Sequence, residues 1–200
     1  MTISRKYYPH LKGGNKWICP AYSPADSDLT EFTIEANKAY FKPFVFERPI
    51  SFDGIGFATH FADNIKSGKI GFYTANQYGL PYKKIDVPEV SWNTASNTGT
   101  GMEKQLHYPT EFFFKSGLYW AYILPTTTVG IYGVNESAEW IPNQGLRNKN
   151  SILYDTASGT LGVMPPELAP SDFTVRAERL NPFIALRVTA TAKKMKDEDV

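Results

Sequence analysis

The strongest strand pattern in the chain is found at residues 118–124, which read LYWAYIL. In an extended strand, alternate side chains point to opposite faces of the sheet. This alternation produces two apolar sets, which are Leu118, Trp120, Tyr122 and Leu124 on one face and Tyr119, Ala121 and Ile123 on the other. A strand that is apolar on both faces is typical of the interior of a sheet that is covered on both sides.

Two earlier runs show the same β-rich composition. Residues 39–46 (AYFKPFVF) form one of them, and their Pro43 predicts a sheet edge or a bulge, because proline cannot donate to a strand ladder. Residues 50–59 (ISFDGIGFAT) form the other, and the Asp53-Gly54 pair predicts a β-bulge within it.

Weaker patterns fill the rest of the chain. A strand is expected at residues 69–73 after a turn at Ser67-Gly68, and residues 29–38 fit either a short helix or a strand. Further strands are expected near residues 129–134, 151–154, 173–177 and 182–189.

The fold class follows from the spacing of these runs. The chain has 200 residues with 14 Pro and 15 Gly, which leaves little room for a long helix. Many short strands between turns predict an all-β protein, a two-sheet antiparallel β-sandwich of jelly-roll-like type. We expect one sandwich domain at residues 29–190, an extended N-terminal arm at 1–28 and a flexible charged tail at 191–200.

Charge and cysteine content exclude several classes of partner. The chain has 21 Lys and Arg against 20 Asp and Glu, a net charge of +1. So balanced a chain has no long-range field to attract nucleic acid or an anionic membrane. Its single cysteine, Cys19, excludes an intrachain disulfide framework. The N-terminus lacks the apolar core of a signal peptide and no window resembles a membrane span, so we expect a protein made in the cytoplasm.

Motifs for catalysis are weak. His10, His60 and His107 lack the spacing of a metal site, and neither a Gly-x-Ser-x-Gly nor a phosphate-binding loop is present. We therefore expect no enzyme activity, no metal and no cofactor. A glycan-cleaving enzyme is kept as a third hypothesis, because two facing carboxylates could come from Asp53, Asp63, Asp86, Glu103 and Glu111.

Two loops and the arm carry aromatic residues that could bind a partner. In the loops at 91–102 and 135–150, a tryptophan is followed by amide side chains that could hold a sugar: Trp92 with Asn93 and Asn97, and Trp140 with Asn143 and Gln144. The alternative is that both tryptophans plug the ends of the sandwich or lie in a subunit interface.

The arm carries five large apolar residues on a segment with little structural preference, namely Tyr7, Tyr8, Leu11, Trp17 and Tyr22. Leaving them all in water is costly, so we expect the arm to dock on a neighbouring subunit or partner protein. Deleting residues 2–28 is then expected to spare the fold and abolish assembly.

Several segments, taken in order, resemble a recurrent β-sandwich domain of tailed-bacteriophage virion proteins. In chain order they are AYFKPF (39–44), ISFDGIG (50–56), GKIGFY (68–73), GLP (79–81), FKSGLYWA (114–121) and FIALRV (183–188). The resemblance covers about residues 38–190 and leaves the arm outside. The residue pair Asp53-Gly54 and the extended loop after Ser91 depart from the family pattern.

The resemblance implies a non-enzymatic virion component of the tail fibre, baseplate, neck appendage or capsid decoration type. Such proteins are often oligomeric, so a homo-oligomer such as a trimer, bound to other virion proteins, is the leading hypothesis. The rival hypothesis is a carbohydrate-binding, host-recognition module of a virion appendage, with its sites in the loops around Trp92 and Trp140.

Overall fold

The computed structural model describes residues 16–18, 29–46, 48–59, 66–87, 89–93, 102–135, 152–154, 163–175, 180–182 and 184–191. Within these residues the regular elements are strands and the short 3-10 helix η3 (Pro170–Asp172). The strands are β1 (Lys16–Ile18), β2 (Leu29–Ile34), β3 (Ala39–Phe46), β4 (Ile50–Thr59), β5 (Ser67–Ala75), β6 (Pro81–Lys84), β7 (Val90–Asn93), β8 (Met102–Phe114), β9 (Gly117–Pro125), β10 (Val129–Asn135), β11 (Ile152–Tyr154), β12 (Phe173–Val175), β13 (Leu180–Pro182) and β14 (Ile184–Thr191). The predicted all-β class is confirmed, and residues 29–34 form a strand, not a helix.

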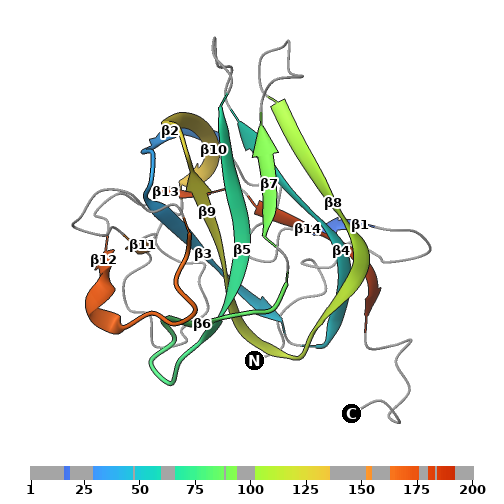
Figure 1. The fold of residues 1–200 in the computed structure, drawn as a ribbon. Helices are drawn as coiled ribbons and strands as arrows, with labels where there is room; N and C mark the ends of the chain where they lie inside the picture. The colour runs from blue at the N-terminus through green and yellow to red at the C-terminus, as the bar shows by residue number, and fades with distance from the viewer. Residues whose placement is uncertain are drawn as a thin grey trace.

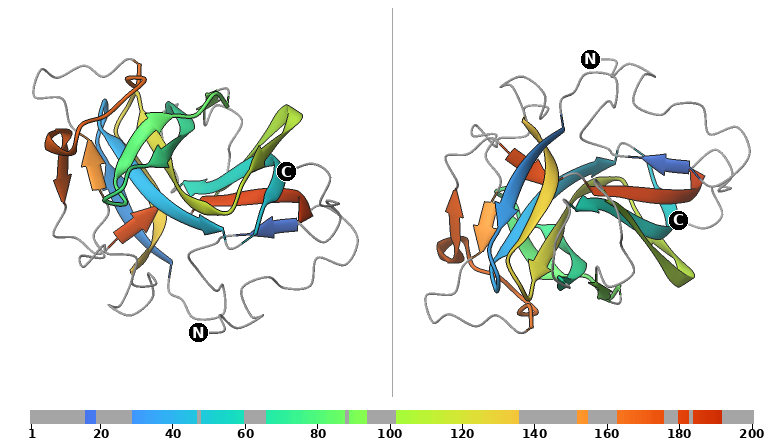
Figure 2. Two further views of the ribbon diagram at one scale, coloured as in Figure 1. Left: turned by 90° about the horizontal axis from the view of Figure 1, so that it is seen from below. Right: turned by 90° about the horizontal axis from the view of Figure 1, so that it is seen from above.

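The strands form two antiparallel sheets (Figure 1). Sheet A has the order β1-β14-β4-β10-β13, with β2 paired to β10 and β8 paired to β4. Sheet B has the order β12-β11-β3-β9-β5-β6, with β7 paired to β5. The views from below and from above show the two sheets as separate layers (Figure 2).

The main core lies between the layers and draws on both of them. Phe52 and Leu186 come from sheet A, and Phe44, Ile70 and Ile123 come from sheet B. All five side chains have no exposed surface. Burial of one such side chain contributes about 1.5–3 kcal/mol, so this shared cluster is what joins the two sheets. The predicted two-sheet sandwich is confirmed.

Strand β9 is the interior strand that its sequence predicts, since it lies between β3 and β5. Its two apolar sets separate as expected: Ala121 and Ile123 join the core between the sheets, whereas Trp120 and Tyr122 join a second cluster. Pro43 of β3 lies opposite Trp120, beyond the part of β3 that pairs with β11 in the described chain. Because β3 lies between β11 and β9 and its register with β9 has no shift at Pro43, β3 is neither the edge strand nor the bulged strand that this proline predicts.

The bulge predicted in β4 is confirmed. Gly54 pairs with Arg187 of β14 and Phe52 with Val188, which leaves Asp53 as an extra residue. The insertion shifts the strand alternation by one position, so the inward side chains are Ile50 and Phe52 before the bulge and Ile55 and Phe57 after it.

An ion pair fixes the bulge in place. The Arg187 guanidinium donates two parallel bonds to the Asp53 carboxylate, from Nε to Oδ1 at 2.6 Å and from Nη2 to Oδ2 at 2.7 Å. The paired fork geometry is the strongest arrangement of these two groups. The ion pair thus ties the bulge of β4 to the neighbouring strand β14.

The turn predicted at Ser67-Gly68 is wrong, because both residues lie inside β5. Gly68 pairs with Trp92 of β7, and a Cβ on Gly68 would lie 2.6 Å from the Trp92 ring. Gly71 lies opposite Tyr122 of β9, and its Cβ would lie 2.5 Å from the Tyr122 hydroxyl. Both glycines therefore leave space for a ring from the neighbouring strand.

Part of the predicted arm belongs to sheet A. Strand β1 pairs antiparallel with β14 of the same chain, with Trp17 opposite Arg187. This differs from the expectation that residues 1–28 lie outside the sandwich. The other arm residues singled out by sequence, Tyr7, Tyr8, Leu11 and Tyr22, lie outside the described residues, as do tail residues 192–200.

Candidate functional site

The outer face of sheet B carries a second apolar cluster, separate from the core between the sheets. Three of its rings contact each other, with centroid distances of 5.7 Å between Phe41 and Tyr73, 5.9 Å between Phe41 and Tyr122, and 5.6 Å between Tyr73 and Tyr122. So large an aromatic surface is unfavourable in water. It needs a cover.

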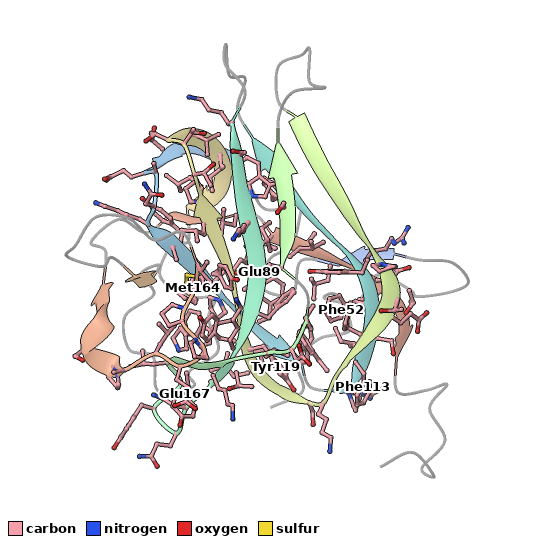
Figure 3. The ribbon with its side chains drawn as sticks, viewed as in Figure 1. Phe52, Glu89, Phe113, Tyr119, Met164 and Glu167 are labelled. Atoms are coloured by element: carbon pink, nitrogen blue, oxygen red, sulfur yellow. The ribbon has the colours of Figure 1, made fainter. Side chains whose placement is uncertain are left out.

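Residues 163–169, which we call the strap, provide this cover. Met164 and Leu168 of the strap are buried in the outer cluster, and Figure 3 shows Met164 against the sheet. The Tyr73 hydroxyl donates a hydrogen bond to the Pro165 carbonyl between these two anchors. The strap is therefore held by apolar burial and by a partly buried hydrogen bond together.

Backbone hydrogen bonds also attach the strap to β6. The Lys84 N–H donates to the Pro166 carbonyl at 2.8 Å, and the Leu168 N–H donates to the Tyr82 carbonyl at 2.9 Å. The strap thus follows β6 much as an added strand would. This pairing fixes the position of the next strap residues relative to β6.

A groove of about 790 Å³ opens where the strap meets the β5–β6 turn. It is lined by residues 75–78, by Tyr82 of β6 and by residues 167–170. Tyr78 is 67% exposed and Tyr82 is 41% exposed, which places both among the most exposed large apolar side chains in the described part of the molecule. Exposed rings beside a groove are typical of a binding surface.

The turn that presents Tyr78 is held rigidly. The Asn76 Oδ1 accepts hydrogen bonds from the Tyr78 N–H at 2.8 Å and the Leu80 N–H at 3.0 Å. Gly79 adopts a φ of +79°, which favours glycine, and its carbonyl accepts a bond from the Trp120 indole N–H at 3.0 Å. The position of Tyr78 is thus set by the sheet, through a buried tryptophan.

A polar cluster lies on the same side of sheet B, around Glu89 (Figure 3). The Glu89 carboxylate accepts hydrogen bonds from the Tyr122 hydroxyl and from the Lys84 ammonium, the latter at 2.9 Å. The Lys69 ammonium lies 3.8 Å away. Burial alone would raise the pKa of Glu89, but these three neighbours outweigh it and the pKa is lowered. Burial and the Glu89 carboxylate raise the pKa of Tyr122, so the hydroxyl stays protonated.

The lowered pKa of Glu89 makes stability depend on pH in a definite direction. The unfolded chain binds this proton more readily, near the ordinary value of 4.5. The ionised carboxylate therefore stabilises the fold above pH 4.5, and that contribution is lost as the pH falls through the folded-state pKa.

Tyr122→Phe is expected to raise the pKa of Glu89 and to destabilise the fold by about 1–2 kcal/mol at neutral pH, because a hydrogen bond to a charged group is removed. The loss should shrink as the pH falls below 4.5 and the carboxylate becomes protonated. Tyr73→Phe is the matched control, because its hydroxyl bonds the carbonyl of Pro165, which does not titrate. Denaturant unfolding of both variants between about pH 3 and 7 tests this, and parallel pH profiles would contradict it.

The structure corrects the expectation for Trp92. Its ring is only 3% exposed and packs against Phe57, with centroids 5.1 Å apart. Its indole nitrogen finds no hydrogen-bond partner in the described part of the chain. A buried ring cannot stack on a sugar from solvent, so at this position the alternative holds, in which tryptophan closes the sandwich.

The other sequence-predicted site residues are not brought together in the described part of the chain. Asn93 ends β7 opposite Ser67, and its side chain is not described. Asn97, Trp140, Asn143 and Gln144 lie outside the described residues.

Sequence analysis missed the groove. Its one local indication was the polar turn at residues 76–81, NQYGLP, in which a tyrosine follows two amides. The other wall contains Glu167 and lies about ninety positions along the chain, beyond the reach of any local pattern.

Neither the models of known protein families nor the curated proteins compared with this chain give a match. The strands and turns that the structure describes contain no cluster of three or more potential metal-binding side chains. Among the same residues no helix has the length and apolar character needed to cross a membrane.

Proposed function

We propose that this chain is a non-enzymatic structural protein of a tailed-bacteriophage virion, where it assembles as a tail, neck or capsid accessory component. The observation that supports this most is where the resembling segments lie in the fold. Residues 39–44 lie on β3, 68–73 on β5 and 117–121 on β9, and these three strands are consecutive in sheet B. Residues 50–56 lie on β4 and residues 184–188 on β14, which are neighbours in sheet A.

A resemblance that follows adjacent central strands carries more weight than the same motifs scattered over the surface would. Central strands set the architecture, because their side chains form the core on which the remaining elements pack. The proposal therefore rests on framework residues and not on one short motif.

A surface suited to assembly lies along β8. This strand of 13 residues pairs with β4, and no other described strand pairs with it. Pro109 carries no N–H, which limits pairing along the edge to the stretches on either side. A strand edge that no other described strand pairs with favours backbone pairing with another subunit.

The arm provides the first test of assembly. We expect the full chain to form a homo-oligomer, such as a trimer, at micromolar concentration, and a deletion of residues 2–14 to keep the fold and lose this association. The deletion spares β1, whereas a deletion of residues 2–28 also removes β1 and uncovers the edge of β14. Native mass spectrometry gives the subunit number, and circular dichroism during heating reports the fold.

Purified phage virions provide the second test. Antibodies raised against the purified chain should label a fixed position on the virions of the phage that encodes it, as seen by electron microscopy. Unlabelled virions would overturn the virion proposal. A full chain that stays monomeric, or a deletion variant that keeps the full oligomeric mass, would overturn assembly through the arm.

A further inference from the structure

We propose that the groove between the β5–β6 turn and the strap binds a neutral oligosaccharide. The inference rests on the rings, amides and carboxylate around the groove and is independent of virion assembly. It goes beyond the proposed structural role, because an assembly protein needs no site for a small soluble ligand.

The two tyrosine rings supply the apolar part of the site. Tyr78 and Tyr82 are exposed by 67% and 41%, and they stand on different elements that both border the groove. A sugar ring has an apolar face of C–H groups that packs on an aromatic ring, whereas its edge carries hydroxyls. Two rings on separate elements suit a ligand of two or more sugar units.

The polar residues supply hydrogen bonds of both kinds. The exposed Gln77 side chain offers a donor and an acceptor, and the exposed Glu167 carboxylate accepts hydrogen bonds. Figure 3 shows Glu167 beside the turn. Sugar hydroxyls both donate and accept, so they match this pair. Among the residues that the structure describes, no lysine or arginine lines the groove, and the Glu167 charge disfavours uronic or sialic acids. The geometry therefore points to uncharged hexoses or N-acetylhexosamines.

A proline-rich peptide is the competing ligand, since aromatic grooves also bind extended proline segments. Such a segment offers carbonyl oxygens and few N–H groups. It would leave the Glu167 carboxylate without a donor, because proline residues have no N–H groups to offer it. The groove chemistry thus favours a ligand rich in hydroxyls.

The site is also ordered before any ligand arrives. Asn76 and the Trp120 indole hold the Tyr78 turn, and the backbone pairing with β6 fixes the strap next to Tyr82. A site held in its binding geometry loses less conformational entropy on binding. This is the expected design for a surface that binds a weakly interacting sugar.

The test uses the purified full chain on an array of neutral, uronic-acid-containing and sialylated oligosaccharides, with a decaproline peptide as a further probe. The strongest neutral hit is then titrated by calorimetry against the wild type, Tyr78→Ala, Tyr82→Ala and Glu167→Gln. Phe113→Ala is the matched control, because this ring has a similar exposure of 43% but lies away from the groove.

We expect neutral oligosaccharides to bind, and each tyrosine substitution to weaken binding by about tenfold or more, as at other aromatic contacts. Phe113→Ala should bind like the wild type. The inference is overturned if no neutral oligosaccharide binds, if binding survives both tyrosine substitutions, or if decaproline binds instead and is lost with them. Because the array uses the isolated chain, its failure leaves the virion test untouched.

Discussion

Gly68→Ala is expected to destabilise the protein by about 3 kcal/mol, although alanine usually suits a strand better than glycine. The added Cβ would lie 2.6 Å from the Leu124 carbonyl oxygen and 2.6 Å from the Trp92 ring. Alanine gains only about 0.5–1 kcal/mol from reduced backbone freedom. The steric cost therefore outweighs this gain, because a backbone carbonyl of the neighbouring strand can move only if the strand moves.

Gly71→Ala makes a useful comparison, because the three nearest atoms to its Cβ all belong to the Tyr122 side chain, at 2.5–2.8 Å. We expect a loss of about 2 kcal/mol that is largely relieved when Tyr122 is also replaced by leucine. Gly68→Ala should not be relieved by Trp92→Leu, since the contact with the Leu124 carbonyl remains.

Urea unfolding of the four single variants and the two double variants measures both coupling energies. A large coupling is expected for the Gly71–Tyr122 pair and a small one for the Gly68–Trp92 pair. Equal coupling in both pairs, or a stable Gly68→Ala variant, would contradict the strand spacing in this part of sheet B.

The framework of the fold could be predicted because its determinants are local. Residues 118–124 alternate between two apolar sets, and the pleat of a strand converts that alternation into two faces with no other information. The bulge at Asp53 was equally local, since an Asp-Gly pair interrupts an apolar strand. The local sequence around Asp53 could not predict its ion-pair partner, because Arg187 lies on a strand that is distant in the sequence.

The candidate site could not be predicted, because exposure of a ring depends on distant residues. Trp92 and Tyr78 both lie near polar turn-forming sequence, yet Trp92 is buried over Gly68 whereas Tyr78 faces solvent. Local sequence predicts a turn at Ser67-Gly68, although Gly68 is the strand residue that makes space for Trp92. Whether Gly68 lies in a turn or in a strand depends on β7 and β9, which pair with this residue only in the folded sheet.

The burial of Lys42 shows that the exposure of a charged residue also cannot be predicted from residue type alone. It lies opposite Ala121, so it shares the face of β3 that meets the core between the sheets, and it is only 1% exposed. Lysine is almost never fully buried in proteins unless it is paired. Composition alone would place it at the surface, but the fixed alternation of β3 decides its position.

Phe52→Ala is expected to have the largest effect of all, a loss of about 4 kcal/mol, as is typical when a fully buried ring is removed. Phe52 has no exposed surface, and its ring meets the rings of Phe72 at 5.5 Å, Tyr108 at 6.0 Å and Phe114 at 4.8 Å. Phe72 belongs to sheet B, so the cavity would open where the two sheets meet. In a domain of this size the loss should lower Tm by about 10 °C.

Phe113→Ala is the matched control, because it removes the same ring from a residue that is 43% exposed (Figure 3). Its cost should stay within about 0.5 kcal/mol, as for other surface positions. Thermal unfolding followed by circular dichroism compares the two variants directly. Because both changes delete identical atoms, the difference between them measures burial alone. Similar small losses would mean that Phe52 does not join the two sheets, and the face-to-face packing of sheet A on sheet B would then be wrong.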